Sequence, residues 1–109
     1  MTAKQWEIWL ANCAFEDDPS TIKPRPMLIL ENKVAYILSA KITGACPRSG
    51  YWGEYSIVYW AEAGLKKPST IRLSKQINLL ATDLKHKLGD LQAVDILGIQ
   101  KMLMKFKIE

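Results

Sequence analysis

The sequence predicts a small, mainly β domain that ends in one C-terminal α-helix. Short runs of aromatic and β-branched residues recur along most of the chain, separated by turn-rich segments, and short strands at this spacing are typical of a barrel or a sandwich. Near the C-terminus the apolar residues instead recur at helical spacing. A chain of 109 residues, 49% of them hydrophobic, can bury one core, so we expect a single domain over residues 1–109.

The expected strands follow one another through short loops. Residues 6–10 contain two tryptophans and an isoleucine, which favour an extended strand. A polar loop is expected over residues 16–24, and the two apolar runs after it predict a hairpin that turns near Asn32 and Lys33. A second exposed loop is expected over residues 45–50. The later strands are predicted at residues 26–31, 34–42, 55–59, 70–73 and 77–82.

A C-terminal helix is predicted from its cap and its apolar stripe. Asp90 is a suitable cap for a helix that begins at Leu91. Gly98 within this helix costs up to ~1 kcal/mol of helix stability relative to alanine, so we expect another part of the protein to pack closely against it. The wide stripe is expected to cover the barrel, a partner subunit or both, and it consists of Ile96, Leu97, Ile99, Met102, Leu103, Met104 and Phe106.

Composition excludes several classes of function. Lys and Arg total 15 against 11 Asp and Glu, a net charge of +4 whose excess lies after residue 61, and this suits a polyanion or an acidic protein as partner. The single histidine and two cysteines, expected to be free thiols, argue against a zinc site, a disulfide scaffold and a hydrolase triad, so we expect no metal and no cofactor. No apolar stretch is long enough to span a membrane and no signal sequence is evident, which predicts a soluble protein of the cytoplasm.

Arg25 is the most informative single residue because it lies between two prolines. Proline fixes its own φ and favours extended backbone before it, so the guanidinium of Arg25 is held on a stiff segment at the start of a strand. A bidentate clamp for a phosphate needs such a side chain. The alternative is an arginine at the barrel rim that pairs with Glu7, Glu16 or Asp17. Spacing alone favours this alternative.

A set of motifs, taken in chain order, resembles one known family. Thr43, at the end of a predicted strand, adds little alone, but it belongs to the segment KIT at residues 41–43. The other motifs are WEIWL at residues 6–10, KPRP at 23–26 before an apolar strand, AGLKKPSTIRL at 63–73, and LGDL at 88–91 before the helix. Over nearly the whole chain, this set is similar to the MazF/PemK family of toxin-antitoxin ribonucleases.

The resemblance implies both a fold and an activity. The fold is the SH3-like, partly open barrel of CcdB/PemK-like proteins, with the terminal helix packed on it and usually assembled as a homodimer. The activity is sequence-specific cleavage of single-stranded RNA, often messenger RNA, so the chain is expected to be an endoribonuclease (an mRNA interferase). The implied partners are this RNA and a cognate antitoxin, here expected to be acidic, that occupies the RNA-binding groove.

The family's catalytic residues map onto this chain by motif. The catalytic arginine falls on Arg25 and the catalytic threonine or serine on Thr43, while Arg72 occupies the place of an arginine that assists in some members. Ser74 stands where some members carry an acidic residue, so we assign it an auxiliary role and leave the general base open. The chain also departs from the family where a glycine often begins the first strand and where a second hydroxyl commonly follows the threonine, at Trp6 and Gly44.

RNA binding usually combines cations with aromatic stacking surfaces. Trp52 is expected to offer such a surface or to lie in the core, and the sequence favours neither. His86, between two lysines, is expected in an exposed turn. The side chains expected to contact RNA are Lys23, Lys41, Arg48 and Trp52.

The residue inventory suits a metal-free reaction, because RNA supplies its own nucleophile. A protein then needs only to orient the 2′-hydroxyl, move protons and stabilise charge. Under this hypothesis Arg25 stabilises the charge around phosphorus and donates a proton to the leaving oxygen, and Thr43 positions the phosphate. The expected products carry 2′,3′-cyclic phosphate and 5′-hydroxyl ends.

Two alternatives stay open. The carboxylates at residues 16–18 can bind Mg²⁺, although a solvated acidic turn is the more common outcome for such a run. The chain can also be a non-catalytic module of the same barrel, which binds a protein or poisons gyrase as CcdB toxins do. Arg25 beside proline and Thr43 at a strand end favour the enzyme.

Overall fold

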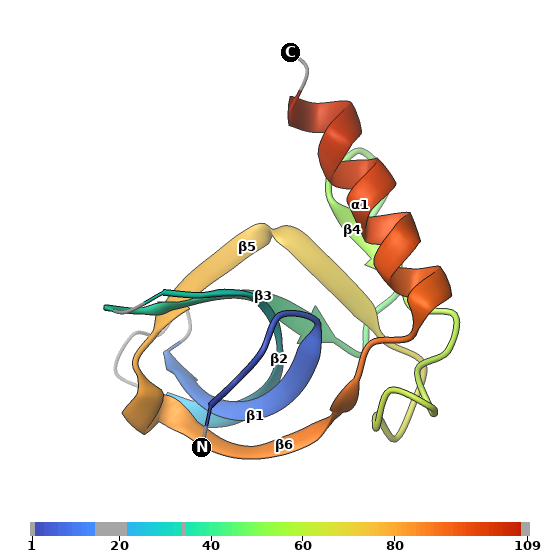
Figure 1. Cartoon of the computed structure of the whole chain (residues 1–109). Helices are drawn as coiled ribbons and strands as arrows, with labels where there is room; N and C mark the ends of the chain where they lie inside the picture. The colour runs from blue at the N-terminus through green and yellow to red at the C-terminus, as the bar shows by residue number, and fades with distance from the viewer. Residues whose placement is uncertain (1, 15–21, 34, 108–109) are drawn as a thin grey trace.

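The computed structural model describes residues 2–14, 22–33 and 35–107 and shows one strongly curled sheet with a helix beside it (Figure 1). In the described part of the chain the six strands run in the order β4-β5-β3-β2-β1-β6, and the barrel stays open between the edge strands β4 and β6. This confirms the predicted class, a mainly β domain with a C-terminal helix. The elements are β1 (Glu7–Ala14), β2 (Ile22–Asn32), β3 (Ile37–Thr43), β4 (Glu54–Ser56), β5 (Thr70–Leu79), η1 (Ala81–Asp83), β6 (Leu84–Asp90) and α1 (Ala93–Lys107).

Both faces of the curled sheet are buried, each in its own hydrophobic cluster. Along β1, Ile8 belongs to one cluster and Trp9 to the other, as the alternation of side chains in a strand requires. The first cluster joins the sheet to the segment 57–65 and to α1, where Ile99 is fully buried. The second includes Met27, which is also fully buried. Burial on both faces explains why these strands are continuous apolar runs in the sequence.

The two prolines of the KPRP motif lie inside β2, which begins at Ile22 and not at the predicted residue 26. The ladder between β2 and β1 passes Pro24 and Pro26 without a break, whereas the ladder between β2 and β3 ends at the pair Met27–Lys41. Proline has no N–H to donate, so a strand with prolines at alternate positions can pair fully on one side only. β2 and β3 therefore separate beyond Met27.

Other predicted elements differ in extent. The hairpin is confirmed, although β3 begins at Ile37 and not at residue 34. The two strands predicted within residues 70–82 are a single strand, β5, whose pairing with β3 contains an irregularity, and the short helix η1 follows it. β4 ends at Ser56 because the backbone N–H groups of Val58 and Tyr59 donate to α1 and not to a strand. Residues 16–21 of the predicted loop lie outside the described residues.

The prediction of a turn around His86 is wrong, because these residues form the edge strand β6. It pairs with β1 and exposes Lys85, His86 and Lys87, so the apolar alternation that identifies a strand is missing from the sequence. The capping role predicted for Asp90 is also wrong. Its carboxylate lies 3.0 Å from the Lys87 ammonium at the end of β6, and α1 begins only at Ala93.

Trp6 forms the turn before β1, in a conformation that normally favours glycine. Its φ is +72°, in the left-handed region where a side chain is unfavourable. Two backbone hydrogen bonds hold it there, from Trp6 N–H to the Ile29 carbonyl at 2.8 Å and from Leu91 N–H to the Trp6 carbonyl at 2.9 Å. A glycine would adopt this conformation without the steric cost that Trp6 carries.

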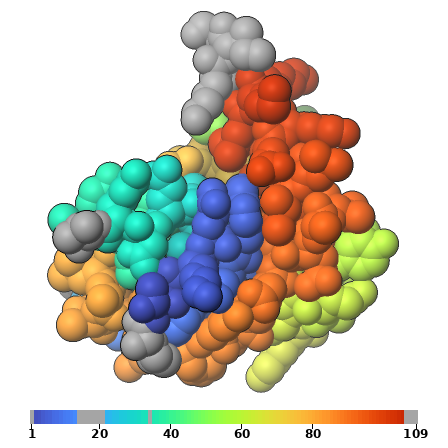
Figure 2. All heavy atoms as spheres, viewed as in Figure 1, coloured from blue at the N-terminus to red at the C-terminus, as the bar shows by residue number. Residues whose placement is uncertain are grey.

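The helix α1 is attached to the barrel through Asp95, a fully buried carboxylate. Its oxygens accept hydrogen bonds from the Tyr55 hydroxyl at 2.7 Å and from the backbone N–H groups of Val58 and Tyr59, both at 2.9 Å. Burial, and next the hydrogen bond to Asp95, raise the pKa of Tyr55. In the space-filling view α1 lies beside β6 and rises past the barrel (Figure 2).

The close contact expected at Gly98 is confirmed. A Cβ placed on Gly98 would lie 2.5 Å from Cε1 of Tyr55, so only glycine lets this ring approach the helix and reach Asp95. The apolar stripe is narrower than predicted, because Leu97 and Met104 are exposed while the buried side is centred on Ile99. The Phe106 side chain lies outside the described residues.

Candidate functional site

A pocket of about 750 Å³ opens where β2 and β3 separate. Three of the eight predicted site residues line it, and they come from these two strands: Arg25, Lys41 and Thr43. The two strands are held from their outer sides, since Arg25 pairs with Ala11 of β1 and Thr43 pairs with Thr70 of β5. The pocket is thus a gap between two strands whose other neighbours keep them in place.

Strand register brings Arg25 and Thr43 together. The last pair of the β2–β3 ladder is Met27–Lys41, so the positions two residues further on, Arg25 and Thr43, face each other across the gap. Residues opposite each other on antiparallel strands share one face of the sheet. The separation of the strands at the prolines therefore leaves these two residues on either side of an opening and not in a closed ladder.

The hydroxyl of Thr43 is oriented by the loop that follows it. Thr43 Oγ1 accepts a hydrogen bond from the Ala45 N–H at 3.3 Å, and the Thr70 hydroxyl donates to the Ala45 carbonyl at 2.8 Å. Because Thr43 accepts with its oxygen, its hydroxyl hydrogen can donate to a group in the pocket. Such a donor suits a phosphate oxygen.

One side of the pocket is a row of residues from neighbouring strands. Leu10 of β1 pairs with Pro26 of β2 and with His86 of β6, and all three line the pocket together with Ile42 of β3. The apolar members of this row exclude water from part of the site. The sequence did not identify His86 as a lining residue, because that required recognising β6.

The opposite wall is the loop before β5, which contributes Lys66 and Lys67. The Lys67 side chain lies over Gly44: a Cβ on Gly44 would be 2.5 Å from Cε and 2.8 Å from Nζ of Lys67. The Lys67 ammonium group therefore lies against the backbone at Gly44, next to Thr43. The motif AGLKKPS contained this signal, since two adjacent lysines precede a proline at the start of a strand.

The pocket is electropositive. Four cationic side chains line it, those of Arg25, Lys41, Lys66 and Lys67, and none of its described lining residues is acidic. Burial and then the charge of Asp83 raise the pKa of the Cys13 thiol, while the charges of Lys41 and Arg25 act in the opposite direction. The geometry and the charge together suit an anionic ligand with a phosphate-sized group.

Other predicted site residues belong to a second group, the Glu54 cluster, which consists of Arg48, Tyr51, Glu54 and Arg72. The Glu54 side chain is only 2% exposed, and its Oε2 lies 3.0 Å from Arg48 Nη2 and 3.3 Å from Arg72 Nε. The Arg48 guanidinium also lies over the Tyr51 ring, 3.9 Å from its centroid. Burial would raise the pKa of Glu54, but the hydrogen bonds from Arg48 and the charge of Arg72 outweigh it and lower this pKa.

The Glu54 cluster borders the pocket without lining it. Arg72 pairs with Lys41, a lining residue, on one side and with Glu54 on the other, so the cluster lies in the same row of the sheet as Lys41. Trp52 next to it is 47% exposed and so is available at the surface. Two further predicted residues do not line the pocket: Ser74 lies on β5 beyond Arg72, and Lys23 lies on the exposed start of β2.

Of the three carboxylates considered as partners of Arg25, Glu7 is the one that lies among the described residues. The Glu7 carboxylate lies 3.1 Å from the Lys87 ammonium and accepts hydrogen bonds from the Trp9 indole and the Lys4 backbone N–H. Glu7 is therefore engaged on the β6 side of the barrel. Glu16 and Asp17 lie outside the described residues, as does the run 16–18 considered for Mg²⁺.

Metal-binding groups, cysteines and membrane-spanning helices were also expectations of the sequence that the described residues address. Within residues 2–14, 22–33 and 35–107, no three His, Cys, Asp or Glu side chains are grouped so that they could hold a metal. Cys13 and Cys46 are free thiols, as predicted. No helix in the described chain is both long and apolar enough to cross a membrane.

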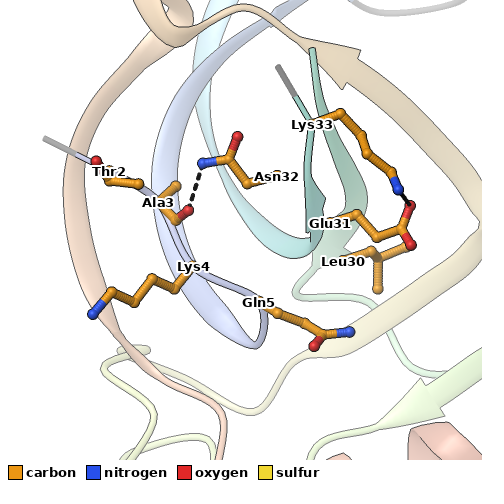
Figure 3. A pocket seen from close by; sticks show the side chains of 8 residues that line it. All are labelled: Thr2, Ala3, Lys4, Gln5, Leu30, Glu31, Asn32 and Lys33. Carbon is orange, nitrogen blue, oxygen red and sulfur yellow. Dashed lines mark hydrogen bonds and ion pairs between the residues drawn. The ribbon is translucent and has the colours of Figure 1, made fainter. Parts of the chain in front are cut away.

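A second pocket lies at the other end of β2 and has a different character (Figure 3). It lies between the N-terminal segment, residues 2–5, and residues 30–33. Asn32 donates to the Ala3 carbonyl at 2.7 Å, and Lys33 pairs with Glu31 at 3.7 Å. None of the eight predicted site residues lines it.

Comparison with solved structures finds the same fold in a bacterial toxin. The structure of the Mycobacterium tuberculosis toxin MazF-mt6 superposes with a TM-score of 0.67 and 24% sequence identity, over 89% of this chain and 91% of that one. No family model and no curated protein matches the sequence. The likeness confirms the MazF-like fold that the motifs implied.

Proposed function

We propose that this protein is the toxin of a toxin–antitoxin pair and a metal-independent endoribonuclease that cleaves single-stranded RNA, chiefly messenger RNA. The observation that carries the proposal is the placement of Arg25, Lys41 and Thr43 around one electropositive pocket in a MazF-like fold. Arg25 and Thr43 are also the two residues on which the catalytic positions of the MazF/PemK motifs fall. Cations, one hydroxyl and an RNA 2′-hydroxyl are sufficient for most of the chemistry of RNA transesterification.

In the proposed reaction the 2′-oxygen attacks the adjacent phosphorus in line with the 5′-oxygen that leaves. Arg25 presents two parallel N–H donors to the phosphoryl oxygens as negative charge develops, and then protonates the leaving oxygen. Thr43 donates its hydroxyl hydrogen to one of the two non-bridging phosphate oxygens, and Lys41 and Lys67 offset the charge. The bond between phosphorus and O5′ breaks, and the fragments carry 2′,3′-cyclic phosphate and 5′-hydroxyl ends.

The remaining predicted residues are proposed to hold the RNA on either side of the cut. Lys23 and Arg48 would neutralise flanking phosphates, and Trp52 would stack on a base. We propose that Arg72, with Ser74 beside it on β5, assists indirectly, because Arg72 fixes Glu54 and Glu54 in turn fixes Arg48.

The proposed partners follow from the same charge. An acidic antitoxin segment can compete with RNA for the electropositive pocket, and this would restrain the toxin in the cytoplasm until the antitoxin is lost. We also propose that the chain acts as a homodimer, which the resemblance implies.

A single 2′-deoxy sugar at the cut site is expected to abolish cleavage, because it removes the nucleophile. The experiment first incubates the protein with a single-stranded RNA library in the presence of a chelator, and sequencing of the fragment ends identifies the cut site. An oligonucleotide with that site is then compared with its 2′-deoxy form. Cleavage of the deoxy form, or activity that requires a divalent metal, would refute the proposed chemistry, and no cleavage of any RNA would favour the non-catalytic module.

Thr43→Val is expected to lower kcat about 10- to 100-fold, the cost of one lost hydrogen bond to a charged group. Thr43→Ser should retain most of the activity because it keeps the hydroxyl. Thr82→Val, an exposed threonine in η1, is the matched control and should cleave at the wild-type rate. Equal rates for Thr43→Val and Thr82→Val would remove Thr43 from the site.

A further inference from the structure

The proposed reaction lacks one part, a group that accepts the proton of the attacking 2′-hydroxyl. Guanidinium and ammonium groups have no lone pair to offer, and a threonine or serine hydroxyl is a poor base. The four cations of the pocket are therefore donors only. None of its described lining residues is a carboxylate, so the usual alternative base is missing from this set.

His86 is the described lining residue whose side chain offers a nitrogen lone pair to a proton. An imidazole in its neutral form has one acceptor nitrogen, and histidine side chains ordinarily titrate between pH 5 and 8. His86 is also the chain's only histidine. Its place at the pocket is set by backbone pairing, since His86 is opposite Leu10 and Leu10 is opposite Pro26, the residue next to Arg25.

His86 and Arg25 line the same pocket from two different strands. β6 and β2 are separated only by β1, and neighbouring strands lie about 4.8 Å apart, so the two backbones are roughly 10 Å apart. His86 lies opposite Leu10 and Arg25 lies opposite Ala11, so the two side chains approach the pocket from different faces of the sheet. The exposed position of His86 on an edge strand leaves it accessible to a bound RNA.

We propose that His86 is the general base of this site, an assignment that rests on the proposed ribonuclease function. The acceptor nitrogen of its imidazole takes the proton of the 2′-hydroxyl as the 2′-oxygen bonds to phosphorus. The bond to O5′ breaks, and the departing oxygen takes a proton from Arg25. Solvent then removes the proton from the imidazole and returns one to the guanidinium, so that protons balance over the cycle.

The charged groups around His86 come from every neighbouring element. Arg25 of β2, Lys41 of β3 and the loop residues Lys66 and Lys67 line the same pocket. On β6 itself Lys85 and Lys87 flank it. Lys87 lies opposite Trp9, on the other face from His86, and is bound by Glu7 and Asp90. Lys85 is the extra residue at the irregularity between the pairs Leu10–His86 and Ala11–Leu84.

His86→Asn tests the assignment, with Lys85→Gln as the control from the next position on the same strand. We expect His86→Asn to lower kcat about 10²- to 10³-fold, the usual contribution of a general base, with KM changed by less than about threefold. A general base predicts a fall of kcat toward acid pH in the wild type and in Lys85→Gln, and this fall should be absent from His86→Asn. Added imidazole should restore part of the kcat of His86→Ala, which a structural role would not allow.

The outcomes separate this assignment from the function on which it rests. Wild-type cleavage that requires the 2′-hydroxyl, together with an unchanged kcat and pH profile in His86→Asn, would overturn the role of His86 and leave the ribonuclease intact. A large rise in KM with kcat unchanged would also overturn it, because His86 would then only bind RNA. Wild-type protein that cleaves no RNA would refute the function and His86 with it. Circular dichroism of both variants verifies that the fold is retained.

Discussion

Arg25→Ala is expected to lower kcat for RNA cleavage about 10³-fold, the upper range for loss of a donor to a charge that develops in the transition state. The loss should exceed that of Thr43→Val, because a guanidinium supplies both charge and two parallel donors. Arg25→Lys keeps the charge without the planar pair of donors, so we expect it to recover only part of the rate. Single-turnover cleavage of the identified oligonucleotide measures all three.

Lys33→Ala is the matched control for Arg25→Ala. Lys33 also carries one positive charge and follows β2, but it lies near the second pocket, at the opposite end of that strand from Arg25 (Figure 3). Its removal should leave kcat within about twofold of the wild type. Similar losses in both variants would show that net charge, and not the position of Arg25, determines the rate.

Asp95→Ala is expected to lower the free energy of unfolding by about 3–5 kcal/mol, which can unfold a domain of ordinary stability. The substitution removes the acceptor of three hydrogen bonds and leaves the Tyr55 hydroxyl and the N–H groups of Val58 and Tyr59 buried without it. Urea denaturation measures the loss. Helix α1 should separate from the barrel first, so fluorescence of Trp60, which packs in the same cluster as Ile99, should change early.

Asp90→Ala is the control for Asp95→Ala. Asp90 is an exposed carboxylate in an ion pair with Lys87, and such surface pairs contribute about 0–1 kcal/mol. The loss of unfolding free energy in Asp95→Asn should lie between those of Asp95→Ala and Asp90→Ala. The amide keeps one acceptor oxygen, but its NH₂ group is a donor placed against N–H groups that also donate. An Asp95→Ala variant as stable as Asp90→Ala would contradict the role of Asp95 in attaching α1.

Part of the fold could be predicted from local pattern alone. β1, the hairpin of β2 and β3, and α1 were predictable because their apolar residues are frequent and regularly spaced. β6 was not, since an edge strand with three exposed polar residues in a row lacks that alternation. The end of β4 depended on Asp95, a residue far along the chain that takes the hydrogen bonds a strand would have used.

The residues of the candidate site also fall into two groups: those that a local motif identifies and those that only long-range contacts bring to the pocket. Arg25 between prolines and Thr43 at a strand end were recognisable as motif residues, and both line the pocket. His86 joins them only through long-range strand pairing, and Lys67 only because its loop lies against Gly44. The Glu54 cluster could not be predicted from the sequence either, because a buried carboxylate between two arginines requires distant segments of the chain to meet.

The sequence by itself determined that the strand around Arg25 would pair on one side only. Pro24 and Pro26 cannot donate hydrogen bonds, so β2 pairs on one side only along this stretch, and its partner there is β1. Arg25, between the two prolines, therefore lies at the gap between β2 and β3. The tertiary structure alone decided what surrounds that gap. Which strand forms the far edge, and which loop folds over Gly44, depend on contacts between residues distant in sequence, and no local pattern of charge or hydrophobicity encodes them.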